Sequence, residues 1–77
     1  MAESLRFTAV YESAEDGWVY VHVPALPEVH TQGRDLEEAR AMVADAIQLV
    51  VTDRRERAEP IPETGWAIAE QIDVSAA

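Results

Sequence analysis

Two alternating runs of residues with an Asp-Gly pair between them constrain this fold more than any other feature. Residues 4–12 and 18–23 each place successive side chains on opposite sides of an extended chain. The apolar side of the first run consists of Leu5, Phe7, Ala9 and Tyr11. Gly17 can adopt the positive φ that a tight hairpin turn requires. The sequence therefore predicts a β-hairpin, and the largely apolar second run indicates that its second strand is central in a sheet.

The next segment, PALPEVHTQG at 24–33, predicts a stiff connection and a short third strand. Proline cannot donate a hydrogen bond to a sheet, so Pro24 should end the second strand. Pro24 and Pro27 would stiffen residues 24–28. Residues 29–32 then form the third strand, and Gly33 closes it.

A capped amphipathic helix follows. Asp35 is a favourable N-cap residue, and Glu38 stands where a capping box places its second acid. Apolar residues recur at intervals of three and four along one side of the helix: Leu36, Ala39, Val43, Ala46, Ile47 and Val50. Three arginines at 54–57 suit the negative end of the helix dipole. The helix should end near Arg57 or Ala58, before Pro60.

Residues 65–74 alternate again and predict a fourth strand, with Trp66, Ile68, Ile72 and Val74 on one side. The predicted order is β-β-β-α-β, an α+β fold in which one helix covers a three-stranded antiparallel sheet and a C-terminal strand is added. We expect residues 1–77 to form a single domain, because a chain of 77 residues is too short for two.

The charge favours a basic partner. Fifteen acids stand against six arginines, with no lysine, and the formal net charge is −9. Such a field repels phosphate, so direct nucleic-acid binding by this chain is not expected.

The chain has no cysteine, hence no disulfide and no thiolate metal site, and no apolar run long enough to cross a membrane. We therefore expect a cytoplasmic protein.

Residues able to support catalysis are sparse. His22 and His30 lie on neighbouring predicted strands, but they lack zinc-motif spacing and a placed nucleophile. We expect no catalytic residues, no metal and no cofactor. A small enzyme that uses one of these histidines is a third hypothesis, beside two in which the chain acts by binding a partner. With one helix, one face of the sheet stays uncovered, so Trp18, Tyr20 and Trp66 could meet a partner.

The motifs of 24–39 resemble the HicB-like antitoxin family. The matching pieces are Val23-Pro24, Leu26-Pro27, Thr31-Gln32-Gly33 and Glu37-Glu38-Ala39. The aromatic strand after Asp16-Gly17, the Ala46-Ile47 pair in the helix and EPIPE at 59–63 also fit. Glu28 and Val29 depart from the pattern, which usually has glycine and cysteine there. The resemblance covers about residues 5–63.

This resemblance implies a partial ribonuclease-H-like fold and an antitoxin that binds and neutralises a small basic mRNA-cleaving toxin, HicA. It also implies homodimers or homotetramers. Family members often carry a C-terminal DNA-binding domain, for which the residues after the helix leave no room, so none is expected. Ribonuclease H chemistry needs clustered acids for two metals. The first strand has no acid in its middle, so we predict no nuclease activity.

The leading hypothesis is an antitoxin of a type II toxin–antitoxin system, and the alternative is a stand-alone, self-associating HicB-like interaction domain without a toxin. Self-association would use a strand edge or the uncovered face of the sheet. The residues predicted to bind the partner are acids and aromatics: Glu12, Glu15, Asp16, Trp18, Tyr20, Glu28, Glu63, Trp66, Glu70 and Asp73.

Overall fold

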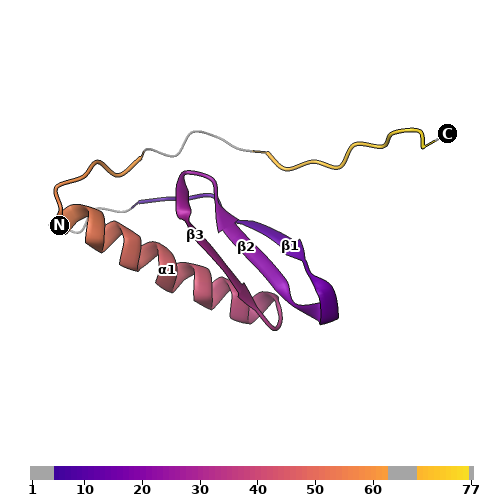
Figure 1. Ribbon diagram of the computed structural model, residues 1–77, viewed down its shortest axis with the longest axis horizontal. Coiled ribbons are helices and arrows are strands. Elements are labelled where there is room, and N and C mark those ends of the chain that lie inside the picture. Colours follow the sequence, from indigo (N-terminus) through magenta and orange to yellow (C-terminus); the bar gives the residue numbers. More distant parts are fainter. Residues whose placement is uncertain (1–4, 63–67, 77) are drawn as a thin grey trace.

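The computed structural model describes residues 5–62 and 68–76. Within them the elements follow the order β1 (Val10–Ser13), β2 (Val19–Val23), β3 (Leu26–Gly33) and α1 (Leu36–Glu56), with a short 3-10 turn between the first two strands. The strands form one antiparallel sheet in the order β1-β2-β3. The helix lies along one face of this sheet (Figure 1). The predicted α+β architecture of three antiparallel strands and one helix is therefore confirmed.

The first hairpin joins β1 (Val10–Ser13) to β2 (Val19–Val23). Asp16 and Gly17 both have positive φ, 61° and 80°, and the Trp18 N–H donates to the Glu15 carbonyl at 3.3 Å. This is the geometry of a type I′ turn, whose twist matches that of paired strands. The Asp-Gly pair therefore forms the predicted turn.

The first strand is shorter than the predicted 4–12 run. Val10 pairs with His22, and β2 ends at Val23 before Pro24. Residues N-terminal to β1 consequently have little of β2 left to pair with. The predicted inward side is nevertheless right, because Phe7, Ala9 and Tyr11 pack against the core.

The third strand is longer than predicted: β3 spans Leu26–Gly33. Only Pro24 and Ala25 separate Val23 from its partner Leu26, while His22 pairs with His30, so the register shifts between these pairs. Such an irregularity accommodates Pro27, which has no N–H to donate. The predicted stiff connection over 24–28 is therefore mostly part of the strand.

Gly33 lets the end of β3 approach the helix. It is buried, and a Cβ at this position would lie 2.8 Å from the Ala39 Cα and closer still to the Ala39 backbone nitrogen. A real side chain does not fit there. The glycine is therefore required by the close contact of two backbones.

The helix α1 spans Leu36–Glu56 and starts as predicted. The Asp35 carboxylate accepts a hydrogen bond from the Glu38 N–H at 2.7 Å. Glu38 does not complete a standard capping box, because its carboxylate accepts from the N–H and the guanidinium of Arg34 instead. The effect is similar, since a free backbone donor before the helix is satisfied.

The core lies between the helix and one face of the sheet. The helix packs mainly against β3 and, less, against β2. The buried apolar residues are Val21, Val23, Leu26, Val29, Ala39, Val43 and Val51. Ala46, Ile47 and Val50 of the predicted helical stripe are partly buried, whereas Leu36 is 40% exposed.

The end of the helix is held by backbone hydrogen bonds and by Arg54. The Ala58 N–H donates to Arg55 O and the Glu59 N–H donates to Arg54 O, with Ala58 at φ 54°. This is a Schellman motif with alanine in the place usually taken by glycine. The Arg54 guanidinium also donates to Pro60 O at 3.1 Å, which fixes where the chain leaves the helix.

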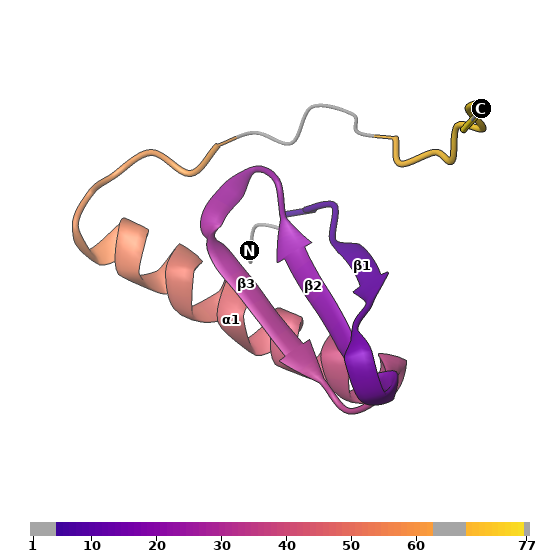
Figure 2. The ribbon, with the colours of Figure 1, turned by 45° about the vertical axis from the view of Figure 1, so that its right-hand side comes forward.

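The predicted fourth strand does not form over the part of it that the structure describes. Residues 68–74 have no strand partner and are all exposed. In both views this segment runs clear of the sheet and the helix (Figures 1 and 2). Alternation makes a run able to pair, but the strand exists only where a neighbouring edge supplies hydrogen bonds.

Candidate functional site

The uncovered face of the sheet is a regular grid of side chains. Because Val21 and Val23 point into the core, their neighbours in β2 point away from the helix. The strand registers place two rows across the three strands: Val10, His22 and His30 in one, and Glu12, Tyr20 and Gln32 in the other. These two rows combine carboxylate, imidazole, phenol and amide groups without arginine or lysine.

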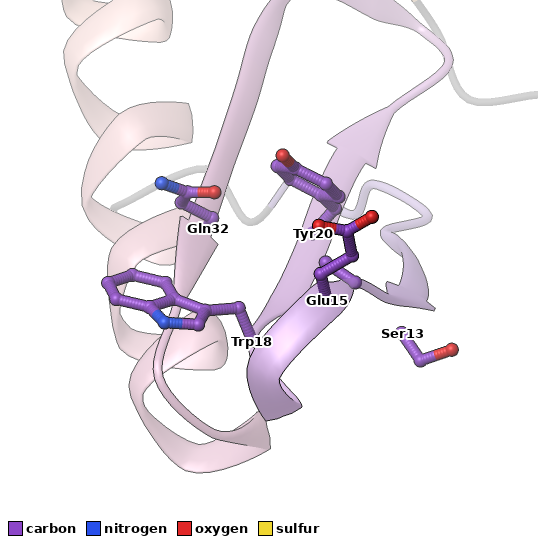
Figure 3. Close-up of a pocket in the computed structure, with 6 residues that line it drawn as sticks. Ser13, Glu15, Trp18, Tyr20 and Gln32 are labelled. Carbon is purple, nitrogen blue, oxygen red and sulfur yellow. The ribbon is translucent and has the colours of Figure 1, made fainter.

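An aromatic and acidic hollow lies where this face meets the first turn. It measures about 660 Å³, and its lining consists of Ser13, Ala14, Glu15, Trp18, Tyr20 and Gln32. The Trp18 ring and the Gln32 amide lie on one side of it, with Tyr20 and Glu15 opposite (Figure 3). We call this hollow the aromatic–acidic hollow.

The type I′ turn positions the hollow. The turn reverses the chain at Asp16 and Gly17. Glu15 and Trp18 flank these two residues and therefore lie close together. Trp18 and Tyr20 keep 36% and 54% of their surface exposed. Exposed aromatic faces beside a carboxylate are a favourable environment for a guanidinium or ammonium group, through cation–π attraction and ion pairing.

A second hollow of about 580 Å³ adjoins the first along the sheet. Tyr20 and Gln32 belong to both, and the remaining lining is Glu12, Val21, His22, His30 and Thr31. The two histidines are cross-strand neighbours, and His22 Nδ1 lies 3.8 Å from Glu12 Oε1. Among the described residues no group of three or more histidine, cysteine or acidic side chains is arranged to hold a metal ion.

Several acids outside this face are bound to arginines of their own chain, among them Glu28 and Glu38. Glu28 accepts two hydrogen bonds from Arg54, at 2.9 and 3.1 Å, and Arg54 is largely buried. The pKa of Glu28 is lowered, first by a hydrogen bond from its own backbone N–H and then by Arg54. The pKa of Glu38 is lowered mainly by its hydrogen bonds to Arg34. Both carboxylates therefore make contacts within the chain that stabilise its fold.

Relatives of the chain are found in archaea and bacteria. A UPF0150 protein of Thermoplasma acidophilum is 35% identical over 72 residues, which cover 94% of this chain and all of that protein. A UPF0150 protein of Synechocystis is 45% identical over 51 residues, 66% of this chain and 71% of that protein. The chain belongs to the HicB-like UPF0150 family.

A further relative carries a functional name. The protein named antitoxin HicB 1 of Photorhabdus laumondii is 33% identical over 72 residues, which cover 94% of this chain but 46% of the antitoxin. This UPF0150 chain thus spans about half of that longer protein. No family model and no solved structure matches the chain described here.

In this UPF0150 member the predicted partner-binding residues separate into groups. Glu15, Trp18 and Tyr20 meet at the aromatic–acidic hollow, Glu12 lines the adjoining one, and Asp16 is exposed in the turn. Glu28 lies apart from them, bound to Arg54. The remaining predicted residues lie elsewhere: Glu70 and Asp73 in the exposed C-terminal segment, and Glu63 and Trp66 outside the described residues.

The residues predicted from the sequence for this surface did not include Gln32, His22 or His30. Gln32 reaches the hollow because it pairs across the sheet with Tyr20. The alternation within 29–32 indicates which of its residues share a face, but the pairing with Tyr20 depends on the register.

Among the residues that the structure describes, no helix has the length and apolar character needed to cross a lipid bilayer.

Proposed function

We propose that this UPF0150 chain is an antitoxin-type protein that binds and neutralises a small basic mRNA-cleaving toxin of the HicA type. The aromatic–acidic hollow is the observation that carries the proposal. It offers Glu15, Trp18 and Tyr20 on a face that the helix leaves open. The relative of this chain that is named antitoxin HicB 1 supports an antitoxin-like role.

The chemistry of binding follows from charge and aromatic surface. A net charge of −9 accelerates the approach of a basic protein. On contact, an arginine or lysine of the toxin would enter the hollow, with its charge against Glu15 and its stem along Trp18 and Tyr20. Buried aromatic residues commonly supply most of the affinity in such interfaces.

Co-expression with any short basic protein that is encoded beside this chain's gene tests the proposal. The wild-type chain should restore growth and form a complex on gel filtration, whereas Glu15→Arg and Trp18→Ala should weaken both. Glu56→Arg is the matched control, because it makes the same charge change at the exposed end of α1. Failure of the wild-type chain to rescue growth, together with no complex, contradicts the proposal.

A stand-alone interaction domain without a toxin is the second candidate. The alignment to the UPF0150 protein of Thermoplasma acidophilum favours it, because it covers that short protein from end to end. A chain of this kind would self-associate and bind some other protein. A genome in which no short basic protein is encoded beside the chain would favour this candidate over the first.

The predictions on assembly and catalysis belong to the same proposal. We propose that the chain forms a homodimer or homotetramer and acts by binding rather than by catalysis. A cleavage assay on structured RNA and on RNA–DNA hybrid with added divalent metal tests the second point. Turnover abolished by substitution of a single acid would contradict it.

A further inference from the structure

The C-terminal arm, residues 68–76, carries the alternating pattern of a strand, although residues 68–74 form none. Ile68, Ile72 and Val74 fall on one side of it, interrupted by Glu70, and the other side is Ala69, Gln71, Asp73 and Ser75. The three apolar side chains are 73%, 73% and 82% exposed. An apolar row of this kind is unfavourable in water, and a partner surface would relieve it.

One edge of the sheet is open to such an arm. β1 is the first strand in the sheet order, and among the described residues it pairs with β2 alone. Residues 5–9 precede it without any assigned strand. The outward N–H and C=O groups of an edge strand are a template for another strand.

Beside this edge the core is incompletely covered. A groove of about 190 Å³ runs between the first segment and the helix, lined by Leu5, Phe7, Ile47, Gln48, Val51 and Arg55. Leu5 remains 38% exposed, because the helix packs mainly under β3 and β2. An arm pairing with the edge would place its isoleucines over this groove. Glu70, in the same row, would face the side of the groove that carries Arg55.

The connector between the helix and the arm is held in place where it begins. Pro60 is held to the helix end by Arg54, which is fixed in turn by Glu28 at 2.9 Å. Pro60 and Pro62 restrict the backbone of this connector. Both views show the arm carried past the sheet instead of along β1 (Figures 1 and 2). A second copy brings an identical arm and an identical open edge.

We infer that the C-terminal arm pairs with the β1 edge of a second copy of the chain, and that two arms exchange reciprocally in a homodimer. The seven residues 68–74 span about 23 Å when extended, the same length as residues 5–11. Such an exchange closes as a two-fold dimer and adds buried surface to a small core. It rests on the proposed self-association but not on toxin binding, because it concerns another side of the molecule from the aromatic–acidic hollow.

Sedimentation of the full chain over a micromolar concentration range tests the exchange. The wild-type chain should be dimeric, and Ile72→Asp should weaken the dimer about a hundredfold or more, because each dimer contains two such contacts. Gln71→Asp is the matched control, since it adds the same charge on the polar side of the arm, and it should leave the dimer intact. A monomeric wild type, or equal effects of both substitutions, overturns the inference.

Isotope-filtered NMR on a mixture of labelled and unlabelled chains separates exchange from other ways of pairing. Intermolecular contacts should join the methyl groups of Ile68 and Ile72 to the Phe7 ring. Contacts of these methyl groups only within one chain would show that the arm folds back on its own edge and would refute exchange. A dimer whose intermolecular contacts lie instead at Tyr20 and His30 would show pairing through the uncovered face, with the same consequence.

Discussion

The two faces of the central strand β2 differ sharply although both carry large apolar or aromatic residues. Val21 and Val23 are each 1% exposed on the helix side, whereas Tyr20 is 54% exposed on the other. The cause is architectural, because a single helix covers one face of the sheet. The covered face holds the fold together, and the uncovered face is free to contact a partner.

Truncating one residue on each face should give the largest contrast. Leu26→Ala removes a fully buried side chain and should lower the free energy of unfolding by about 2–4 kcal/mol, close to the whole stability of a small domain. Tyr20→Ala should cost less than about 1 kcal/mol. Urea denaturation of the two variants measures both effects, and equal losses would contradict the assignment of the faces.

The close contact between β3 and α1 can be tested at Gly33. Gly33→Ala should destabilise the protein by about 1–3 kcal/mol, because its Cβ has no space against the Ala39 backbone. Gly17→Ala has open space around its Cβ but a φ of 80°, so it should cost only about 1 kcal/mol. Thermal unfolding of both variants separates crowding from backbone conformation, and a Gly33→Ala variant as stable as wild type would disprove the crowding.

The smallest effect should be a pH dependence from Glu28 and Glu38, two of the acids bound to arginines. The folded-state pKa values of Glu28 and Glu38 lie below the ordinary 4.5, so their stabilising effect is present above pH 4.5 and is lost as the pH falls through the lowered values. Both carboxylates are exposed enough for salt to weaken the effect.

Denaturation at several pH values measures this dependence. Arg54→Met keeps the aliphatic stem but removes the charge bound to Glu28, so it should flatten the loss of stability below pH 4.5. Arg40→Gln removes the same charge elsewhere on α1 and serves as the control. An unchanged acid profile in Arg54→Met would show that this pair contributes nothing.

Local signals in the sequence predicted most of the folded body. Asp16-Gly17 predicted the turn, Asp35 predicted the start of the helix, and alternation predicted which residues of β2 share a side. The extent of β3 was not predictable in this way. Its residues 26–28 join the strand through a register shift around Pro27, which depends on how β2 and β3 pair.

The site was predictable in part for the same reason. Glu15, Trp18 and Tyr20 are close in sequence to one turn, so their meeting follows from the hairpin. Gln32 joins them only through the pairing of β3 with β2. Residues 68–74 have the pattern of a strand but not its structure, because a strand also needs hydrogen bonds from a neighbouring strand, and this segment pairs with none among the described residues of its own chain.

Chemical-shift mapping of the labelled chain, during titration with a short basic protein encoded beside its gene, tests the central claim most directly. The account predicts shifts at Glu15, Tyr20 and Gln32 and at the Trp18 indole N–H, with little change along α1. It also predicts that Glu15→Arg weakens binding of this protein in the titration, whereas Glu56→Arg does not. Shifts concentrated on α1, or no shifts at all, would contradict the claim that the uncovered face binds the partner.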